Sequence, residues 1–524
     1  MAAQPSAPVA RCQYPLIGVA AVVMGAFVST LNSRITTFGL ADIRGGLSLG
    51  FDEGAWLTAV FSATQMIVAP TAAWLSTVIG ARRFLFWASL VFGVASFLVP
   101  FAGTYPEIIA LQAVRGLAVG TFIPATLGFI LRTMPPRWWI WGIAAYSFRF
   151  VFSQNVASSI EAFYSETGRW EWIFWQNTAL TPLFLLLILI GMPNQPIDRN
   201  LLRRTDWGGI VFAGLGFGLL YAGIDQGNRL DWLNSGTVLG LLCGGGILIV
   251  AFFINEAVVK YPLIHLGIAS HPYVWVPALL ITLYGLGTTA TAFVLPDYLT
   301  RVQGLRALQI GDVLNWIALP QFLLVPLIAW LLRWIDARLM IAIGFAIIAV
   351  GSWMDADLTH DWANADFLPS QIVQAVGLAL AITALVTYTV ANITPPQAAA
   401  IAATIQTARL FGSELGSAFI QTFVRIREQF HSNLIEQHLS SGTDIVQRFI
   451  DILSAVFDDH PTGRDATAQA LATIGARVQR QSFVLAYIDA FWVIAWGLTF
   501  AILLLLLLRP PPPNPLTPPL KSAG

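Results

Sequence analysis

Charged residues are scarce in this sequence. Only 11% of its 524 residues are Asp, Glu, Lys or Arg, whereas a soluble globular protein carries roughly 25%. This shortage argues against a soluble enzyme and against a disordered protein. The 28 Lys and Arg are balanced by 28 Asp and Glu. No net field therefore attracts a nucleic acid, and we expect no nucleic-acid partner.

Cysteine and histidine are also scarce. The two cysteines, Cys12 and Cys243, cannot form a disulfide framework, and neither lies in a CxxC pattern or beside a histidine as a zinc site requires. The acidic segment 355–366 matches no metal-ligand spacing. None of the six histidines falls in a predicted membrane span. We therefore predict no metal and no cofactor, and a membrane-embedded enzyme or sensor is only a remote alternative.

Hydrophobic residues, by contrast, make up 56% of the chain and gather in long runs. A helix that crosses the hydrocarbon core needs about 20 mostly apolar residues. The sequence contains fourteen such runs, and no signal-peptide cleavage site follows the first. We therefore predict an all-α polytopic membrane protein with fourteen transmembrane helices, at 15–38, 53–77, 83–104, 107–131, 139–163, 171–192, 206–224, 236–256, 273–299, 309–332, 338–354, 367–392, 398–424 and 482–508.

The basic residues set the predicted orientation, because Lys and Arg in short loops stay on the cytoplasmic side. With both termini in the cytoplasm, the inner segments hold thirteen Lys and Arg, and the short outer loops hold five. Tryptophans near the span ends match the aromatic belt expected at both membrane surfaces. The sequence thus predicts a multi-pass protein whose two termini are cytoplasmic.

Residues 425–481 form the longest predicted loop, which lies outside in this topology. Apolar residues recur there at helical spacing from Ile445 to Phe457, and a second helix is predicted from 464 to 480. Two interpretations are open: an amphipathic hairpin that rests on the membrane surface, or a docking surface for a partner protein. The proline-rich residues 509–524 are predicted to be a disordered tail.

One stretch of the sequence combines an acid, spaced glycines and a polar turn. It consists of Asp206, Trp207, Gly208, Gly209, Gly214, Gly216, Gly218 and the run 225–232. It closely resembles a stretch of the fourteen-helix drug:proton antiporters of the major facilitator superfamily, in which it forms the seventh helix and the turn after it. Here it falls on the seventh predicted span, so the pattern and the topology agree.

Other segments resemble the same family over nearly the whole chain. Residues 73–83 resemble the loop after helix 2 that latches the two halves in one state, although Ala73 replaces a glycine and Thr77 an acid. The resemblance implies that Arg82 and Arg83 belong to this gating loop. Further matches lie at residues 172–177 and at Pro395 and Pro396.

Three family positions are altered in ways that bear on mechanism. Helix 1 has Asn32 where the family has an acid, with Arg34 two residues later. In helix 4, Gln112 stands at the position of the family's arginine, and Arg115 lies three residues later on the same helix face. The glycine-rich motif typical of antiporters is replaced in residues 157–162. Transport is therefore better supported than antiport.

Ionisable side chains inside membrane spans cost about 2.5–3.5 kcal/mol each on insertion scales, so they are usually paired or functional. The spans contain four arginines but only one acid far from both surfaces, Glu414. An arginine stays cationic when buried, so the predicted pathway is positive and suits an amphipathic organic anion. The predicted substrate-binding residues are Arg34, Arg115, Asn32, Gln112 and Arg149, and the predicted proton-coupling residues are Glu414, Arg409 and Glu161.

Structural interpretations stay open for the same residues. Each arginine can pair with helix carbonyls or an acid and only hold helices together. Glu414 can hydrogen-bond across a close helix contact formed by Gly412 and Gly416.

The resemblance implies the major facilitator fold, with six helices in residues 1–205, two inserted helices in 206–272 and six in 273–508. We expect export of a hydrophobic or amphipathic compound, a drug or an organic or fatty acid, across the bacterial inner membrane by proton-coupled alternating access. The family also implies a periplasmic adaptor protein and an outer-membrane channel as partners, besides the small-molecule substrate and membrane lipid. A proton-independent facilitator or an importer of an organic anion is the alternative.

Overall fold

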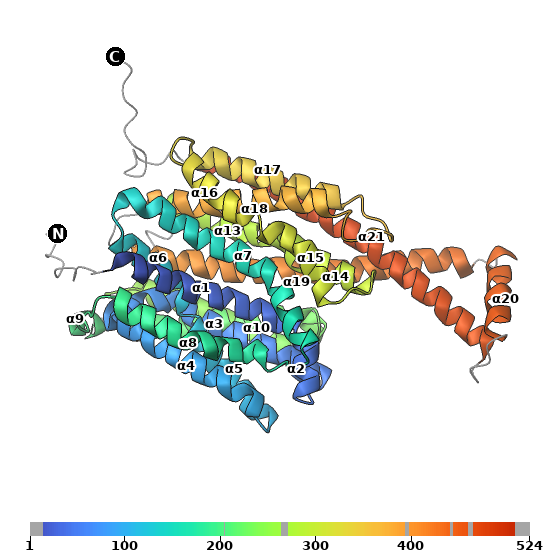
Figure 1. The fold of residues 1–524 in the computed structure, drawn as a ribbon, viewed down its shortest axis with the longest axis horizontal. Helices are drawn as coiled ribbons and strands as arrows, with labels where there is room; N and C mark the ends of the chain where they lie inside the picture. The colour runs from blue at the N-terminus through green and yellow to red at the C-terminus, as the bar shows by residue number, and fades with distance from the viewer. Residues whose placement is uncertain are drawn as a thin grey trace, which may run out of the picture.

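The structure is a computed structural model that describes residues 14–203, 205–263, 271–392, 398–440, 444–458 and 465–508, and these residues form helices without a β-strand. Within them, eleven helices are long and apolar enough to cross a membrane. The three other predicted spans correspond to the more polar helices α3 (Phe51–Ile79), α7 (Trp139–Glu166) and α19 (Ala398–Ser440), which pack in the same bundle (Figure 1). The all-α class is confirmed, and the count of fourteen crossings stays a prediction.

The first eight α-helices form one group, which we call the N-terminal group. In it α1 packs on α7 and α8, α3 on α5, and α4 on α8. The predicted span 107–131 is divided near Gly120, where a Cβ would lie 2.6 Å from the Gln65 carbonyl oxygen of α3. Besides α3 and α7, its elements are α1 (Pro15–Phe38), α2 (Leu40–Gly46), α4 (Ala81–Leu98), η1 (Val99–Phe101), α5 (Tyr105–Val119), α6 (Phe122–Thr133), η2 (Pro136–Trp138) and α8 (Trp172–Gly191).

The helices from residue 272 onward form the second group, the C-terminal group. In it α13 packs on α19, and α17 packs on α18 and α21. The predicted span 309–332 is interrupted at Pro320, which lacks the backbone N–H that a continuous helix uses. Besides α19, its elements are α13 (Pro272–Thr289), η4 (Ala290–Val294), α14 (Leu295–Arg301), α15 (Ala307–Ala318), α16 (Gln321–Leu331), α17 (Ala337–Asp355), α18 (Leu368–Ala391), α20 (Asp444–Asp458), α21 (Ala466–Leu504) and η6 (Leu505–Leu507).

Two helices connect the groups. After the short α9 (Arg199–Arg203), α10 (Trp207–Gly227) packs on α3 of the N-terminal group and on α19 of the C-terminal group. The turn η3 (Trp232–Asn234) then leads to α11 (Gly236–Val258), which contacts mainly α10 and has only 17% of its most apolar stretch buried. The inserted pair therefore touches both groups through its first helix.

The predicted loop 425–481 is largely helical. Residues 425–440 continue α19 and residues 466–481 begin α21, so the predicted second helix is present as the start of a longer one. With 43 and 39 residues, these helices reach about 65 and 60 Å, roughly twice the hydrocarbon thickness. They project beyond the bundle with α20 at the tip (Figure 1). Both interpretations of this segment, an amphipathic hairpin on the membrane surface and a docking surface for a partner protein, stay predictions.

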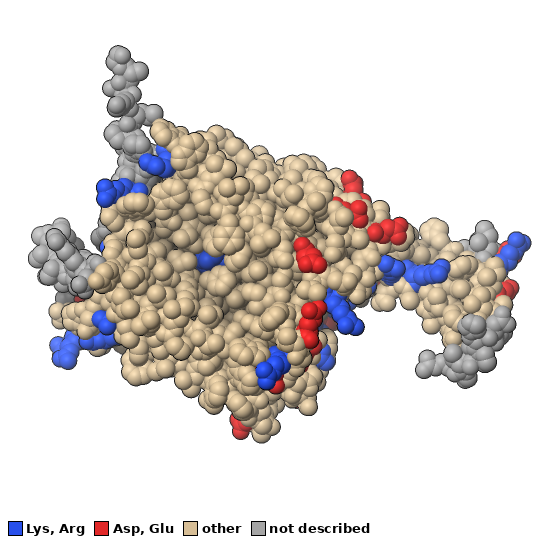
Figure 2. Space-filling view, viewed as in Figure 1, with Lys and Arg blue, Asp and Glu red and all other residues tan. Residues whose placement is uncertain are grey.

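Charged side chains gather at the two ends of the bundle. Figure 2 shows a wide band of the surface that is almost free of charged side chains, between two ends where charged side chains gather. The helix α9 lies at one end, and α2 and the projecting hairpin lie at the other (Figure 1). We call the end that carries the hairpin the outer end, following the predicted topology. Residues 509–524 and the pair Pro395 and Pro396 lie outside the described residues.

Candidate functional site

Arg115 of α5 is fully buried inside the N-terminal group. Its Nε donates to Ser96 Oγ at 2.9 Å, its Nη2 donates to Asn32 Oδ1 at 2.7 Å, and its Nη1 donates to Gln112 Oε1. Asn177 Nδ2 donates to the same Asn32 oxygen at 2.7 Å. Three residues that the sequence marks as candidates for separate reasons, Asn32, Gln112 and Arg115, therefore belong to one hydrogen-bond network.

Neutral groups surround this cation. Arg115 forms no ion pair with a described acid, and its guanidinium lies 4.7 to 5.5 Å from the ring centres of Phe174, Phe61 and Phe92. Ring faces and carbonyl dipoles stabilise a buried cation when several act together. Each of its three guanidinium nitrogens already has an acceptor, so Arg115 is fixed within its own helix group.

Arg34 of α1 reaches the other group. Its Nη2 donates to the carbonyl oxygen of Ala292 at 2.8 Å, and its guanidinium lies 5.0 Å from the ring centre of Phe38. Ala292 belongs to η4, a π-helical turn between α13 and α14. A π turn displaces the regular helix hydrogen bonds and is frequent at functional sites. Arg34 therefore links α1 to an irregular turn of the C-terminal group.

Two further buried arginines, one on α7 and one on α19, lie near the same aromatic ring, that of Phe150. Arg149 of α7 is fully buried and donates to Thr30 Oγ1 at 2.7 Å. Arg409 of α19 is 6% exposed, and its charge acts on Arg149. The guanidinium carbons of Arg149 and Arg409 lie 5.9 and 4.8 Å from the ring centre of Phe150. The structure thus brings two predicted site residues, one assigned to substrate and one to proton coupling, to the same place.

Glu414 lies five residues beyond Arg409 on α19 but faces a different helix. It is 9% exposed and interacts with the Tyr221 hydroxyl and the nearby Asp225 carboxyl, both on α10. A second acid beside Glu414 is a feature that the sequence does not reveal, because α10 and α19 are far apart along the chain. The deepest predicted acid therefore lies between the inserted pair and the C-terminal group.

The glycines next to Glu414 serve another contact. A Cβ on Gly412 would lie 2.4 Å from Thr282 Cα, and a Cβ on Gly416 would lie 2.9 Å from Leu286 Cα, both on α13. The glycine face of α19 thus packs on α13, whereas Glu414 faces α10. Glu414 does not take part in the glycine contact that its sequence position suggested.

The segment that replaces the family's glycine-rich motif joins the two groups. Ser158 Oγ of α7 donates to the Ala307 carbonyl at 2.7 Å, and Asn315 Nδ2 of α15 donates to Ser159 Oγ at 3.0 Å. Both contacts lie in the outer part of α7. The contact of Arg34 likewise lies in the outer part of its own helix, α1. The altered residues therefore make polar contacts between α7 and α15.

The remaining predicted residues lie apart from this interface. Glu161 is buried beside Asp42 of α2 at the outer end. Arg82 and Arg83 lie in the first turn of α4 at the opposite end. This helix begins at Ala81, directly after Gly80, whose φ of +93° allows the sharp turn. Arg82 is half-buried and Arg83 is exposed, and neither pairs with a described acid.

The residues that carry the family resemblance have defined structural roles. Asp206 caps α10 by accepting from Gly209 N at 2.8 Å, and it also accepts from Asn255 Nδ2 of α11 at 2.6 Å. A Cβ on Gly214 or Gly218 would lie 2.7 Å or 2.4 Å from atoms of Ile67 on α3. Spaced glycines therefore let α10 approach α3 closely.

The turn after α10 contacts both groups at the outer end. Arg229 forms an ion pair with Asp52 at the start of α3. Trp232 Nε1 donates to Thr422 Oγ1 of α19 at 3.0 Å, and Arg425 lies 3.4 Å from Asp231. The Asn234 amide, and after it Arg425, holds the pKa of Asp231 below its usual value. We call Arg229, Asp231 and Trp232 the outer clasp.

The helical bundle and its buried polar interface are those of a polytopic transporter, and comparison with known proteins gives the family. The profile described as Major Facilitator Superfamily matches residues 22–419. The chain belongs to the major facilitator superfamily. It is a secondary transporter of small molecules and not an enzyme.

Relatives and solved structures agree. The chain is 23% identical to the multidrug export protein EmrB of Haemophilus influenzae over 91% of this chain and 92% of that protein. It is also 23% identical to the fatty acid resistance protein FarB of Neisseria gonorrhoeae over 92% and 93%. The proton:xylose symporter XylE matches the fold with a TM-score of 0.57 at 12% identity, covering 94% of both chains. The predicted resemblance to this superfamily is confirmed.

Proposed function

We propose that this transporter exports a hydrophobic or amphipathic compound, a drug or an organic or fatty acid, across the bacterial inner membrane in exchange for protons. Relatives named for multidrug export and for fatty acid resistance span over nine-tenths of the chain. Fourteen crossings in a 6+2+6 order, divided at residues 205 and 272, complete the proposal. Substrate binds between the two groups, which rock against each other about the contacts of α7 with α15, α16 and α18 and of α19 with α3 and α6.

The observation that carries the proton-coupling part is the buried Glu414. Glu414 of α19 interacts with the Tyr221 hydroxyl and with the Asp225 carboxyl, both on α10. A carboxyl group buried in an apolar interior near a second carboxyl group is suited to bind and release a proton when its surroundings change. Because α19 also carries Arg409 at the contact of the groups, protonation and substrate position act on one helix.

Inverted membrane vesicles with an imposed pH gradient test this. Uptake of dodecanoate or ethidium into them depends on the gradient in the native protein. Glu414→Gln removes the dependence but leaves binding of the same probe measurable. The matched control is Glu436→Gln, which removes an exposed carboxylate from the projecting part of the same helix. Unchanged coupling in Glu414→Gln returns this residue to helix packing.

If probe uptake by the native protein does not depend on the pH gradient, the result favours the proton-independent facilitator. One observation supports that alternative: Asn32, which stands at the family's acidic position, accepts hydrogen bonds from Arg115 and Asn177 and carries no proton to exchange. A gradient that drives the probe out of inverted vesicles favours an importer.

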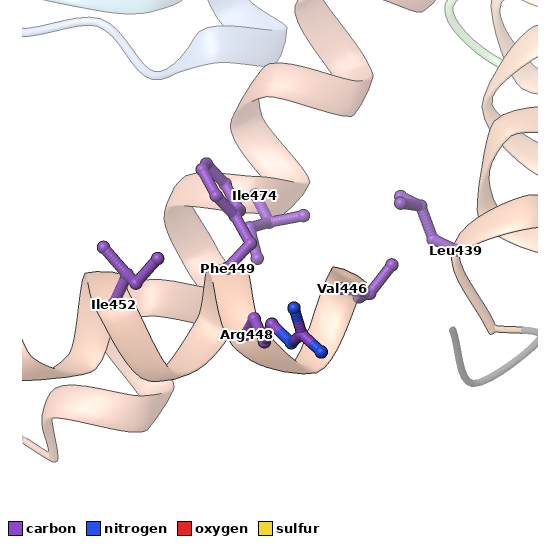
Figure 3. A pocket seen from close by; sticks show the side chains of 6 residues that line it. All are labelled: Leu439, Val446, Arg448, Phe449, Ile452 and Ile474. Carbon is purple, nitrogen blue, oxygen red and sulfur yellow. The ribbon is translucent and has the colours of Figure 1, made fainter. Parts of the chain in front are cut away.

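We also propose that a periplasmic adaptor protein, which leads to an outer-membrane channel, docks on the projecting hairpin. The tip has an apolar cavity of about 410 Å³, lined by Leu439, Val446, Arg448, Phe449, Ile452 and Ile474 (Figure 3). Side chains from α19, α20 and α21 all contribute to it, away from the membrane band. An apolar face so placed suits a protein partner better than lipid.

The docking proposal is tested by comparing cellular resistance, which requires the adaptor, with uptake into inverted vesicles, which does not. Replacing Ile452 and Val456, which are 62% and 55% exposed, by Glu abolishes cellular resistance to the exported compound while uptake into inverted vesicles stays unchanged. Gln447→Glu adds the same charge at an exposed position of the same helix and leaves resistance intact. Full resistance in the Ile452 and Val456 variant excludes docking at the tip.

A further inference from the structure

The most unusual electrostatic feature of the bundle is the pair Arg149 and Arg409. One lies on α7 of the N-terminal group and the other on α19 of the C-terminal group, and both are more than nine-tenths buried. Neither forms an ion pair with an acid in the part of the chain that is described. Two like charges in an apolar interior repel each other far more strongly than in water.

The hydrogen-bond donors of this pair are incompletely used. Among the described residues, Arg149 Nε and Nη2 have no acceptor, and Gln406 Nε2 has none although Gln406 Oε1 accepts from Arg409 Nε at 3.1 Å. Three buried donor nitrogens without an acceptor destabilise the folded protein unless a ligand supplies one. Arg115, whose three guanidinium nitrogens all have neutral acceptors, shows the contrast within the same bundle.

Aromatic side chains enclose the two guanidinium groups. The Arg149 guanidinium lies 4.4 Å from the ring centre of Tyr146, and Phe150 lies next to both arginines. Tyr284 of α13 packs on Phe150 with ring centres 6.1 Å apart. The surroundings are thus apolar on the sides and rich in N–H donors at the centre, which is the composition that binds an anionic head attached to an apolar body.

We propose that Arg149 and Arg409 together form a carboxylate-binding site between the two helix groups, and that its ligand is a monocarboxylate with an aromatic or alkyl body. The carboxylate accepts from Arg149 on one side and from Arg409 on the other, and its body lies along Tyr146, Phe150 and Tyr284. This assigns Arg409 to substrate binding. The inference rests on the proposed transport of organic acids.

A bound carboxylate also changes the electrostatic interaction between the N-terminal and C-terminal helix groups. Without a negative charge between them, Arg149 and Arg409 oppose the close approach of the two helix groups; a bound anion turns this repulsion into attraction on both sides. The ligand therefore favours the arrangement in which the two groups are in contact, which is the differential binding that any ligand-driven rocking requires.

Equilibrium binding to the purified full chain in neutral detergent tests the site without any gradient. The probe is 2-naphthoate, followed by calorimetry, and the uncharged 2-naphthamide is its matched compound. The native protein binds naphthoate at least ten-fold more tightly than naphthamide. Arg149→Gln and Arg409→Gln each weaken naphthoate binding about ten- to hundred-fold, the range of one charge-assisted hydrogen bond, and leave naphthamide binding unchanged. Arg306→Gln, which removes an exposed arginine, changes neither.

Thermal unfolding gives a second readout. Each Gln variant without ligand unfolds at the native temperature or above, because a repulsive pair has been removed, and naphthoate stabilises the native protein but not the variants. Equal binding of naphthoate and naphthamide, native affinity in both Gln variants, or displacement of naphthoate by millimolar chloride each overturns the proposal. If naphthoate does not bind at this site but gradient-driven drug export is intact, the proposed function stands and the site is refuted. If naphthoate binds but no gradient-driven transport occurs, the proposed function is refuted and the site stands.

Discussion

Arg34 Nη2 and the carbonyl oxygen of Ala292 lie 2.8 Å apart although 258 positions separate the two residues in the chain. The Ala292 carbonyl lies in the π-helical turn η4, and it lacks the usual helix donor because Pro296, four residues later, has no backbone N–H. It ties α1 to the long helix of α13, η4 and α14. Any state in which the outer end opens between these helices has to break this hydrogen bond.

We expect Arg34→Met to favour opening at the outer end. One hydrogen bond contributes about 0.5–1.5 kcal/mol, so a cysteine placed at Ser159 reacts about two- to ten-fold faster with a membrane-impermeant thiol reagent applied from outside. Thr37→Val is the control, since Thr37 Oγ1 donates only to Ser33 of its own helix. Unaltered labelling with weakened organic-acid binding would show instead that Arg34 contacts the substrate, as the sequence predicts.

The outer clasp predicts a measurable coupling between Trp232 and Thr422. Trp232→Phe and Thr422→Val each remove the hydrogen bond of 3.0 Å between the clasp and α19. In a double-mutant cycle of thermal unfolding, the double variant should lose about 0.5–1.5 kcal/mol less unfolding free energy than the sum of the two single variants. Thr422→Ser keeps the hydroxyl and should stay close to the native protein. Strict additivity would mean that the two side chains do not interact.

The spaced glycines of α10 predict a sharp difference between two alanine substitutions. Gly214→Ala places a Cβ 2.7 Å from the Ile67 carbonyl oxygen of α3, whereas Gly240 of α11 has nothing within 4 Å of that position. We expect Gly214→Ala to destabilise the folded protein by about 1–3 kcal/mol through overpacking. Gly240→Ala should be neutral or slightly stabilising, since alanine favours helix. Thermal unfolding of both variants in one detergent measures this.

The predicted topology places Asn200 in the cytoplasm and Gly475 outside, because seven predicted spans separate them. Asn200 lies in the exposed α9, and Gly475 lies in the projecting part of α21 with open space around it. With both native cysteines replaced, an impermeant thiol reagent applied to whole cells should label Gly475→Cys and spare Asn200→Cys. Reversed labelling would contradict the orientation, and labelling of both would contradict the number of spans.

Hydropathy predicts the helices well because lipid allows few alternatives to a continuous helix. Hydropathy does not predict where a helix continues beyond the membrane. Residues 425–440 are too polar to be counted in a span, yet they continue α19 and pack against α21. The breaks near Gly120 and Pro320 and the π turn at Ala292 depend on neighbouring helices or on one residue, and a 20-residue average does not detect them.

The candidate site is predicted only in part. The sequence identifies Arg115, Arg149, Arg409 and Glu414 correctly as buried polar residues and Arg34 as a half-buried one, because a charge within an apolar run is a strong signal. It does not reveal which of them meet. The partners Ser96, Asn177 and Thr30 are ordinary polar residues in helices, and Asp225 becomes relevant only through the packing of α10 on α19.

Helix α19 runs without interruption from Ala398 to Ser440. It carries Arg409 and Glu414 within the bundle and Leu439 at the tip cavity, so these residues belong to one stiff rod. A tilt of about 10° at Glu414 moves the tip, about 39 Å further along the helix, sideways by roughly 7 Å. In the proposed mechanism, substrate binding at Arg409 and protonation of Glu414 would therefore displace the tip outside the membrane, where the proposed adaptor docks.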